Sequence, residues 1–276
     1  MKSFKNMTRH AFRAAAAVAI GGAVLSQMPS AEAAATNSTP ILVVHGASLP
    51  NPSSGIDCKD SVMLPWVNGL KARGFTNVKT VGYYSNDRNC DLWVPGRADN
   101  TVNTSLDLIG REFANLISSR YGSTPVAISA HSMGGLVVRR ALAGVQNRHP
   151  LFPTNIRVSD VVTAGTPHAG TGAARACAPF LKQCEQMVPG SGFLGALAHN
   201  PQTAGSTDWT LTGSDCDLVV SADSATRMNQ VSPNRPPIFR QIFPDPGLCI
   251  GGVSHDELVT KTGPLNVINT GLRTGN

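Results

Sequence analysis

The sequence has little excess charge and few aromatic residues, and both absences bear on its partners. Aromatic side chains make up 5% of the 276 residues, and the formal net charge is +6. The first 33 residues hold four basic residues and one acidic residue, which leaves 19 basic and 16 acidic residues in the rest of the chain. A surplus of three basic residues, with no aromatic residues interleaved among them, is too small to indicate a nucleic-acid-binding surface. We therefore expect no nucleic acid among the partners.

Long hydrophobic runs are absent beyond the N-terminal region. The run there, residues 14–25, is too short for a stable transmembrane anchor. It is preceded by four basic residues, Lys2, Lys5, Arg9 and Arg13. The small-x-small triplet Ala31-Glu32-Ala33 follows it, as in a secretory signal peptide. We predict a signal peptide at residues 1–33, a secreted protein and one catalytic domain at residues 34–276; the alternative is an uncleaved amphipathic segment.

Cys-x2-Cys pairs and clusters of cysteine with histidine are also absent, so we expect no metal site. The chain has six cysteines, all beyond residue 33. An even number of cysteines in an exported protein indicates disulfides. Spacing alone leaves many pairings open. Pairing by local order predicts the bridges Cys58–Cys90, Cys177–Cys184 and Cys216–Cys249.

Hydrophobic periodicity predicts an α/β protein. The continuous apolar run at residues 41–44 indicates a buried strand, and further strands are predicted at residues 78–84, 126–129, 158–163, 209–212 and 238–243. Apolar residues at helical spacing lie between them, at residues 63–70, 103–121, 136–143 and 264–272. Strands alternating with helices form a mostly parallel sheet with helices on both faces. Residues 85–102 are expected to form a polar loop, and residues 172–200 contain no long regular element.

The segment Ala130–Gly135 joins a predicted strand to a predicted helix, with Ser132 in the turn. Strand, tight turn with a serine, then helix is typical of a nucleophile elbow, in which a strained backbone directs the hydroxyl into a cleft. The residues two before and two after the serine must be small, because strand and helix pack closely there. They are Ala130, where glycine is usual, and Gly134. Ser132 is therefore the predicted nucleophile.

A serine hydroxyl needs a base to accept its proton, usually a histidine, and that histidine needs an acid to hold its tautomer. On α/β sheets of this kind, the acid and then the base follow the serine in the chain. His255 lies after the last predicted strand, in a glycine-rich loop, and is the predicted base. His168 is the second candidate, although its place after a strand favours the cleft floor. His131, beside the serine, is expected to face away.

Asp215 and Asp217 both follow the fifth predicted strand, where the acid is required. They are two residues apart, so in an extended segment they would face the same side, and spacing does not separate them. We favour Asp217, because the apolar run Leu218–Val220 would anchor it at the sheet edge, whereas Asp215 would suit a solvated turn. A Cys216–Cys249 bridge would tie the acid loop to the loop of the base and hold the two in register.

The negative charge that develops on the attacked carbonyl oxygen needs two backbone N–H donors. One is expected from Met133, the residue after the nucleophile. The other is expected from the loop after the first strand, His45-Gly46-Ala47, with Ala47 as the candidate donor. The alternative for this His-Gly segment is an ordinary turn.

In combination, these motifs resemble the secreted bacterial lipases of the α/β-hydrolase superfamily, and most closely the small class 2 lipases, whose elbow also begins with alanine. The similarity runs from about Pro40 to the C-terminus. It rests on the segments Val43–Gly46, Ala130–Gly135, Gly165–Thr171, Asp217–Val220 and Gly252–His255. The resemblance implies the α/β-hydrolase fold, the nucleophile Ser132, the acid Asp217, the base His255, and the oxyanion donors Ala47 and Met133.

The chain departs from the small members of that family in length and in its number of cysteines. The extra residues fall mostly at 85–102 and 172–206. The second segment would suit a lid over the cleft. Its apolar run Phe193–Leu197 would suit an acyl chain or an interface, or else forms an ordinary packed helix.

We expect a secreted serine hydrolase that cleaves carboxylic esters through an acyl-enzyme, as a triacylglycerol lipase or carboxylesterase. It would need no cofactor, work as a monomer, and meet a lipid or other ester, including esters at a lipid–water interface. A second enzyme interpretation is a polyhydroxyalkanoate or cutin depolymerase, against which the few aromatic residues weigh. A third is a binding protein on an inactive hydrolase fold, against which the complete set of serine, acid and base weighs.

Overall fold

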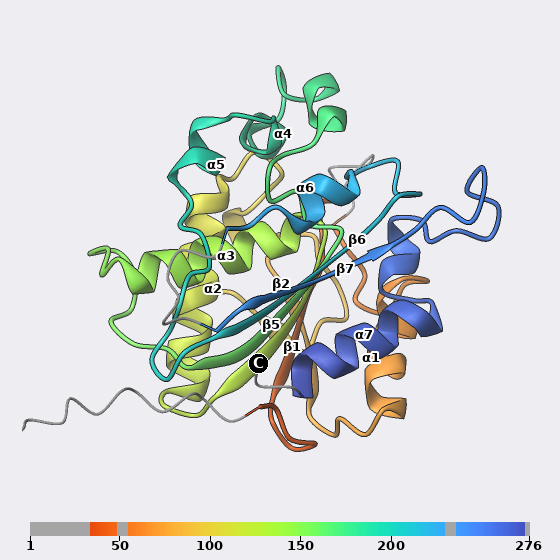
Figure 1. Cartoon of the computed structure of the whole chain (residues 1–276). Coiled ribbons are helices and arrows are strands. Elements are labelled where there is room, and N and C mark those ends of the chain that lie inside the picture. Colours follow the sequence, from red (N-terminus) through yellow and green to blue (C-terminus); the bar gives the residue numbers. More distant parts are fainter. Residues whose placement is uncertain (1–33, 49–54, 230–235, 274–276) are drawn as a thin grey trace, which may run out of the picture.

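Seven parallel strands form one sheet in the computed structural model of the chain, which describes residues 34–48, 55–229 and 236–273 (Figure 1). The strand order is β3-β2-β1-β4-β5-β6-β7. The strands are β1 (Ile41–Val44), β2 (Val78–Gly82), β3 (Leu92–Trp93), β4 (Val126–His131), β5 (Val158–Ala164), β6 (Asp208–Ser214) and β7 (Ile238–Phe243). The predicted α/β class is confirmed. The predicted signal peptide, residues 1–33, lies outside the described residues.

The central strands are apolar because both faces of the sheet are covered. Every residue of β1, β4, β5 and β6 is buried. The parallel register pairs Val44 with Val81 on one side and with Ala130 on the other, so the carboxyl ends of β1, β2 and β4 meet at one edge. In open parallel sheets, ligands bind outside this edge. The loops that follow these strands are therefore the place to look for a site.

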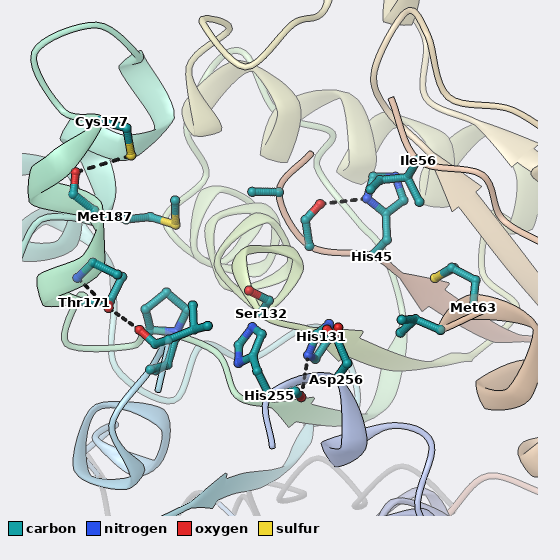
Figure 2. A pocket seen from close by; sticks show the side chains of 18 of the residues that line it. His45, Ile56, Met63, His131, Ser132, Thr171, Cys177, Met187, His255 and Asp256 are labelled. Carbon is teal, nitrogen blue, oxygen red and sulfur yellow. Dashed lines mark hydrogen bonds between the residues drawn. The ribbon is translucent and has the colours of Figure 1, made fainter. Parts of the chain in front are cut away.

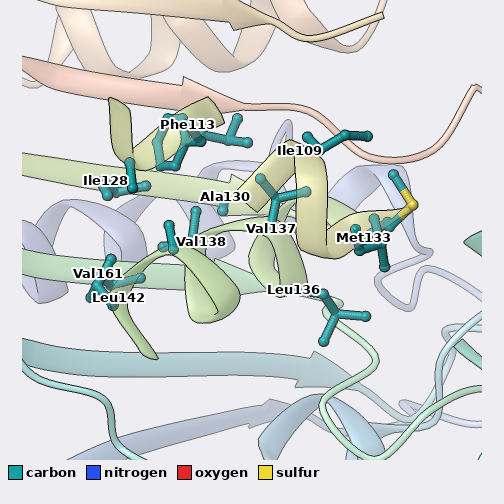
Figure 3. Close-up of a cluster of buried hydrophobic side chains, with 14 of the residues drawn as sticks. Ile109, Phe113, Ile128, Ala130, Met133, Leu136, Val137, Val138, Leu142 and Val161 are labelled. Carbon is teal, nitrogen blue, oxygen red and sulfur yellow. The ribbon is translucent and has the colours of Figure 1, made fainter. Parts of the chain in front are cut away.

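Helices pack on both faces of the sheet (Figure 1). On one face, α2 (Leu106–Tyr121) packs against α3 (Met133–Gln146); on the other, α1 (Met63–Ala72) packs against α7 (Thr262–Arg273). Each face has its own hydrophobic core. Figure 3 shows apolar side chains of α2 and α3 gathered over β4. Each large side chain buried there contributes roughly 1.5–3 kcal/mol, and this packing holds α3, and thus the turn before it, against the strand.

Residues 85–102 are not wholly a polar loop, and that prediction was wrong in part. They contain β3 and a 3-10 turn at Arg97–Asp99. β3 pairs with β2 at two positions, Val81 with Leu92 and Gly82 with Trp93. An edge strand of two residues carries no hydrophobic periodicity, so the sequence pattern did not indicate it.

The segment after β5 contains three short helices, which are η2 (Gly172–Ala176), α4 (Lys182–Met187) and α5 (Gly192–Ala196). Within α5 and just after it, Leu194 and Leu197 are buried in the same core as α2 and α3. Of the two alternatives for the apolar run Phe193–Leu197, the structure therefore favours the ordinary packed helix. The remaining short helices are α6 (Ala222–Thr226) and η3 (Asp256–Leu258).

Three disulfides join Cys58 to Cys90, Cys177 to Cys184, and Cys216 to Cys249, the same pairing as the one expected from local order. Among the described helices, none has the length and apolar character needed to cross a membrane.

Candidate active site

Ser132 lies in the turn between β4 and α3, at the carboxyl edge of the sheet. β4 ends at His131, α3 begins at Met133, and Ser132 between them has a φ of 54°. A positive φ is unfavourable for a residue with a Cβ and persists only where the surrounding structure imposes it. Here the fixed strand and the fixed helix impose it. The strand–turn–helix geometry expected from the sequence is present.

The small residues around Ser132 allow another loop to approach it. A Cβ on Gly134 would lie 2.2 Å from the carbonyl oxygen of His45 and 2.6 Å from that of Val44, so no larger residue fits there. A Cβ on Gly46 would lie 2.8 Å from the Cβ of Ser132. The loop after β1 therefore passes directly beside the serine.

His255 and Asp217 form a hydrogen-bonded pair after β7 and β6. The distance between His255 Nδ1 and Asp217 Oδ2 is 2.6 Å, and the side chain of Asp217 is fully buried while 14% of the His255 side chain is exposed. The other carboxylate oxygen accepts the N–H groups of Val219 (2.8 Å) and Val220 (2.9 Å). These bonds orient the carboxylate. Nδ1 of His255 carries the proton toward it, which leaves Nε2 as the proton-accepting nitrogen.

Asp215 and Asp217 do not share a side, so that expectation was wrong. Asp215 is exposed. β6 ends at Ser214, and the chain then turns, with the N–H of Asp217 bonded to the Ser214 carbonyl oxygen at 3.2 Å. The reason given for Asp217 holds only in part, because Leu218 is 94% exposed whereas Val220 is 1% exposed. Backbone hydrogen bonds from Val219 and Val220 to the carboxylate also hold Asp217.

Ser132 and His255 line the same pocket, with a volume of about 530 Å³ (Figure 2). Ala47, one expected oxyanion donor, lines it too. Met133, the other, is the first residue of α3, and the N–H groups in the first turn of a helix have no partner within the helix. The pocket thus combines a hydroxyl, an imidazole and two backbone segments able to donate hydrogen bonds.

Residues 172–206 supply one wall of this pocket. Ala174 of η2, together with Cys177 and Met187, lines it. The hydroxyl of Thr171 donates a hydrogen bond to the carbonyl oxygen of Val219, which joins this wall to the acid loop. That the segment opens and closes as a lid stays a prediction.

The prediction that His131 faces away from the site is wrong. Its ring lines the pocket and lies against the ring of His255, with the centroids 4.6 Å apart. Its Nε2 is 3.0 Å from the carbonyl oxygen of His255, which can only accept, so the ring donates there. Burial, and then the charge of His255, lower the pKa of His131 to about 3. His131 therefore holds the His255 loop as a neutral ring.

His131 should make the fold sensitive to acid. Its pKa is about 3 in the folded chain and about 6.5 in the unfolded chain. As the pH falls through this window, the unfolded chain takes up a proton that the folded chain does not. The free energy of unfolding should therefore drop by about 1.4 kcal/mol per pH unit, with the full contribution present above about pH 6.5. Urea unfolding at a series of pH values gives the unfolding free energy at each pH. Its slope against pH should be smaller in His131→Gln than in the wild type by about that amount.

The matched control is His149→Gln, because His149 is exposed. It should leave the pH dependence of the unfolding free energy unchanged. Equal slopes for the wild type and His131→Gln would contradict a buried neutral ring.

His168, the second base candidate, lies in the interior and not on the cleft floor. It is 3% exposed, and its Nε2 is 3.0 Å from the hydroxyl oxygen of Thr163. Burial, followed by the charge of Arg139, lowers its pKa well below the ordinary value. The structure does not bring His168 to Ser132.

The sequence patterns missed a second buried histidine–carboxylate pair beside the pocket. His45 Nε2 is 3.0 Å from Asp87 Oδ2, and the two side chains are 2% and 0% exposed. An aspartate inside a predicted polar loop is normally solvated, so nothing in the local pattern marked Asp87. The predicted bridge Cys58–Cys90 was the available signal, since it brings the loop of Asp87 back toward the loop after β1.

Among the described residues, Cys216, Asp245 and Cys249 form a cluster of metal-ligand types. Both cysteines belong to one disulfide, so neither offers a thiolate to a metal.

Removing the Cys216–Cys249 bridge should weaken both the fold and the site. It closes a loop of 33 residues between the acid and base loops, and the chain entropy of such a loop corresponds to about 3–4 kcal/mol. The double variant Cys216→Ala/Cys249→Ala should lose roughly that stability. It should also lose about tenfold or more in kcat, because small displacements of catalytic groups are costly. Urea unfolding and ester hydrolysis measure the two effects.

The matched control is Cys58→Ala/Cys90→Ala, whose bridge spans 32 residues. It should lose similar stability while the acid and base loops stay joined, so the NMR signal of the His255 Nδ1 proton that faces Asp217 should persist in this variant and be lost in Cys216→Ala/Cys249→Ala. The same behaviour of that signal in both double variants would contradict a role of Cys216–Cys249 in holding the pair.

The chain has the α/β-hydrolase fold. It is similar to Bacillus licheniformis lipase BlEst2 in its propeptide form, at 15% identity and a TM-score of 0.53, covering 90% of this chain and 53% of that one. It is also similar to the product of gene lin2722 from Listeria innocua, at 14% identity and a TM-score of 0.52, covering 87% of this chain and 95% of that one.

A further similar structure is phospholipase PlaB from Legionella pneumophila, at 12% identity and a TM-score of 0.53, covering 86% of this chain and 60% of that one. The chain thus spans about half the length of the BlEst2 propeptide form. No protein-family model matches the sequence, and no curated protein matches it. At these identities the likeness concerns the fold.

Proposed function

We propose that this protein is a serine hydrolase that cleaves carboxylic esters through an acyl-enzyme. The observation that carries the proposal is the hydrogen-bonded pair of His255 and Asp217, at 2.6 Å, beside a pocket that His255 shares with the strained Ser132. A buried carboxylate, an oriented imidazole and a serine at a nucleophile elbow that lines the pocket are the parts that acyl transfer needs.

In the proposed reaction, the hydroxyl oxygen of Ser132 attacks the ester carbonyl carbon while Nε2 of His255 takes the hydroxyl proton. Asp217 stabilises the imidazolium that forms, and the N–H groups of Ala47 and Met133 bind the oxyanion. The imidazolium then gives its proton to the leaving alcohol. Water, activated by the same histidine, releases the acid and restores the serine. Each step uses groups that the chain itself supplies.

The substrate we propose is a lipid ester or a related carboxylic ester, as for a triacylglycerol lipase or carboxylesterase. The pocket is lined largely by apolar side chains, among them Met63, Met187 and Val220. Next to it, Leu218 and Val219 are 94% and 44% exposed, which suits contact with a lipid–water interface. Two proteins of similar fold, BlEst2 and PlaB, are a lipase and a phospholipase, which supports this substrate class.

We also propose that the mature protein begins after residue 33, is secreted and acts as a monomer without a cofactor. The three disulfides support a location outside the reducing cytoplasm. The N-terminal basic residues, the apolar run at residues 14–25 and the triplet Ala31-Glu32-Ala33 also support export.

A fluorophosphonate probe and a series of p-nitrophenyl esters of increasing acyl length test the proposal. The probe should label the wild-type protein at Ser132, and the ester series should give a preferred chain length. Labelling combined with clearing of a polyhydroxyalkanoate or cutin suspension, but no hydrolysis of lipid esters, would select the polyester interpretation instead. Absence of both labelling and hydrolysis would leave the binding-protein interpretation.

A further inference from the structure

A buried histidine holds the loop that presents Ala47 to the pocket. His45 is 2% exposed and stacks on Tyr83, with the ring centroids 4.1 Å apart. Its Nδ1 is 2.8 Å from the carbonyl oxygen of Gly46 (Figure 2), and its Nε2 is 3.0 Å from Asp87 Oδ2. Both ring nitrogens therefore meet an oxygen.

Both of these oxygens are acceptors. Asp87 Oδ2 also accepts the N–H groups of Tyr83 (2.7 Å) and Tyr84 (2.8 Å), and Oδ1 accepts that of Ile56 (2.7 Å). Burial raises the pKa of Asp87, but the charge and hydrogen bond of His45 and the backbone donors outweigh it, so the pKa is lowered. A carboxylate and a carbonyl can only accept, so both nitrogens of His45 must donate. The ring is then an imidazolium.

The carbonyl of Gly46 and the N–H of Ala47 belong to one peptide unit. In a trans peptide these two groups point in opposite directions. The Gly46 oxygen meets His45 Nδ1 and, at 2.6 Å, the hydroxyl of Tyr83, whose pKa burial raises well above the ordinary value. With the carbonyl held by a charged ring and a neutral phenol, the N–H is directed the other way. Hydrogen bonds at one end of a peptide polarise it, so the N–H becomes a stronger donor.

We propose that His45, charged and paired with Asp87, acts with Tyr83 to position and polarise the Gly46–Ala47 peptide as the oxyanion donor. The inference rests on the proposed function, because it assigns these residues a task in that reaction. His45 is a positioning residue whose two ring nitrogens are both engaged within the protein. It orients the donor before negative charge develops on the substrate, and this preorganisation is where oxyanion holes gain their effect.

The protonation state can be measured without any assay of activity. Nitrogen-15 NMR of the histidine rings near neutral pH, with His45→Gln to assign the signal, should show both nitrogens of His45 protonated. In Asp87→Asn, which removes the charge and keeps the shape, the signal should move to that of a neutral ring. An unprotonated nitrogen on His45 in the wild type would overturn the proposal.

The effect on the reaction is tested by a matched pair of tyrosine variants. Tyr83→Phe removes the hydroxyl that lies 2.6 Å from the Gly46 oxygen and 2.8 Å from the His45 oxygen, whereas Tyr121→Phe removes a hydroxyl at the C-terminal end of α2. Tyr83→Phe should lower kcat roughly tenfold, less than the loss of a whole oxyanion donor, with KM changed by no more than about twofold. Binding of an alkylboronic acid, which mimics the tetrahedral state, should weaken by a similar factor. Tyr121→Phe should change none of these values.

Equal kcat values for Tyr83→Phe and the wild type, or equal losses in the two tyrosine variants, would overturn the proposal. A higher KM with unchanged affinity for the boronic acid would also overturn the proposal, because it would indicate a structural role alone. A wild-type protein that hydrolyses no ester would refute the proposed function, and the NMR experiment would still decide the charge of His45.

Discussion

Replacing Ser132 with alanine is expected to lower kcat for ester hydrolysis by about 10⁶-fold, the loss typical of removing a serine nucleophile. Without the hydroxyl, no acyl-enzyme can form, and only binding and the oxyanion donors remain to assist water. Initial rates on a p-nitrophenyl ester, with enzyme concentration set by absorbance, measure the loss. The fluorophosphonate probe should no longer label the protein.

The fold of Ser132→Ala should be retained. The backbone at this position already has a positive φ, which alanine meets at the same cost as serine, and backbone hydrogen bonds from Ser132 N–H to Ala164 and from Gly135 N–H to Ser132 hold the elbow. Circular dichroism and the urea midpoint should match those of the wild type. A folded variant that keeps even a tenth of the activity would refute Ser132 as the nucleophile.

Asp217→Asn is expected to lower kcat by about 10⁴-fold while the protein stays folded. The amide can keep one oxygen toward the N–H groups of Val219 and Val220, which hold the carboxylate now. Its NH₂ group would then face Nδ1 of His255 and favour the tautomer with the proton on Nε2, where the serine proton has to go. Steady-state kinetics across a pH series measures the loss.

Asp215→Asn is the matched control, since it makes the same change two residues away on an exposed side chain. Its kcat should lie within about twofold of the wild type, as for most surface substitutions. The opposite ranking of the two variants would move the acid to Asp215 and contradict the geometry of the His255 pair.

Periodicity in the sequence was enough to predict the elements that hold the site. β1 is a continuous apolar run, β4 begins with one at Val126–Ile128, and α2 repeats its apolar residues at helical spacing, so the sequence pattern alone predicts their form. Ser132 could be predicted for a similar reason, since the strained turn depends on neighbours in the chain, Ala130 and Gly134.

Side chains that depend on the path of a turn could not be predicted in this way. Asp215 and Asp217 look equivalent by spacing, and they differ because β6 ends at Ser214 and the chain closes a hydrogen-bonded turn there. His131 was misplaced because the loop of His255 folds back over the end of β4 on the side where His131 points, beside Trp66.

The sequence by itself determined the parallel α/β architecture, the turn at Ser132 and the order of Ser132, Asp217 and His255 at the ends of successive strands, because these follow from local burial patterns and chain order. Only the tertiary structure decided which aspartate meets His255, that His131 supports the His255 loop, and that His45 and Asp87 form a buried pair behind Ala47. These contacts join residues 38 to 124 positions apart, so their geometry depends on how the sheet and its loops pack and not on any local pattern.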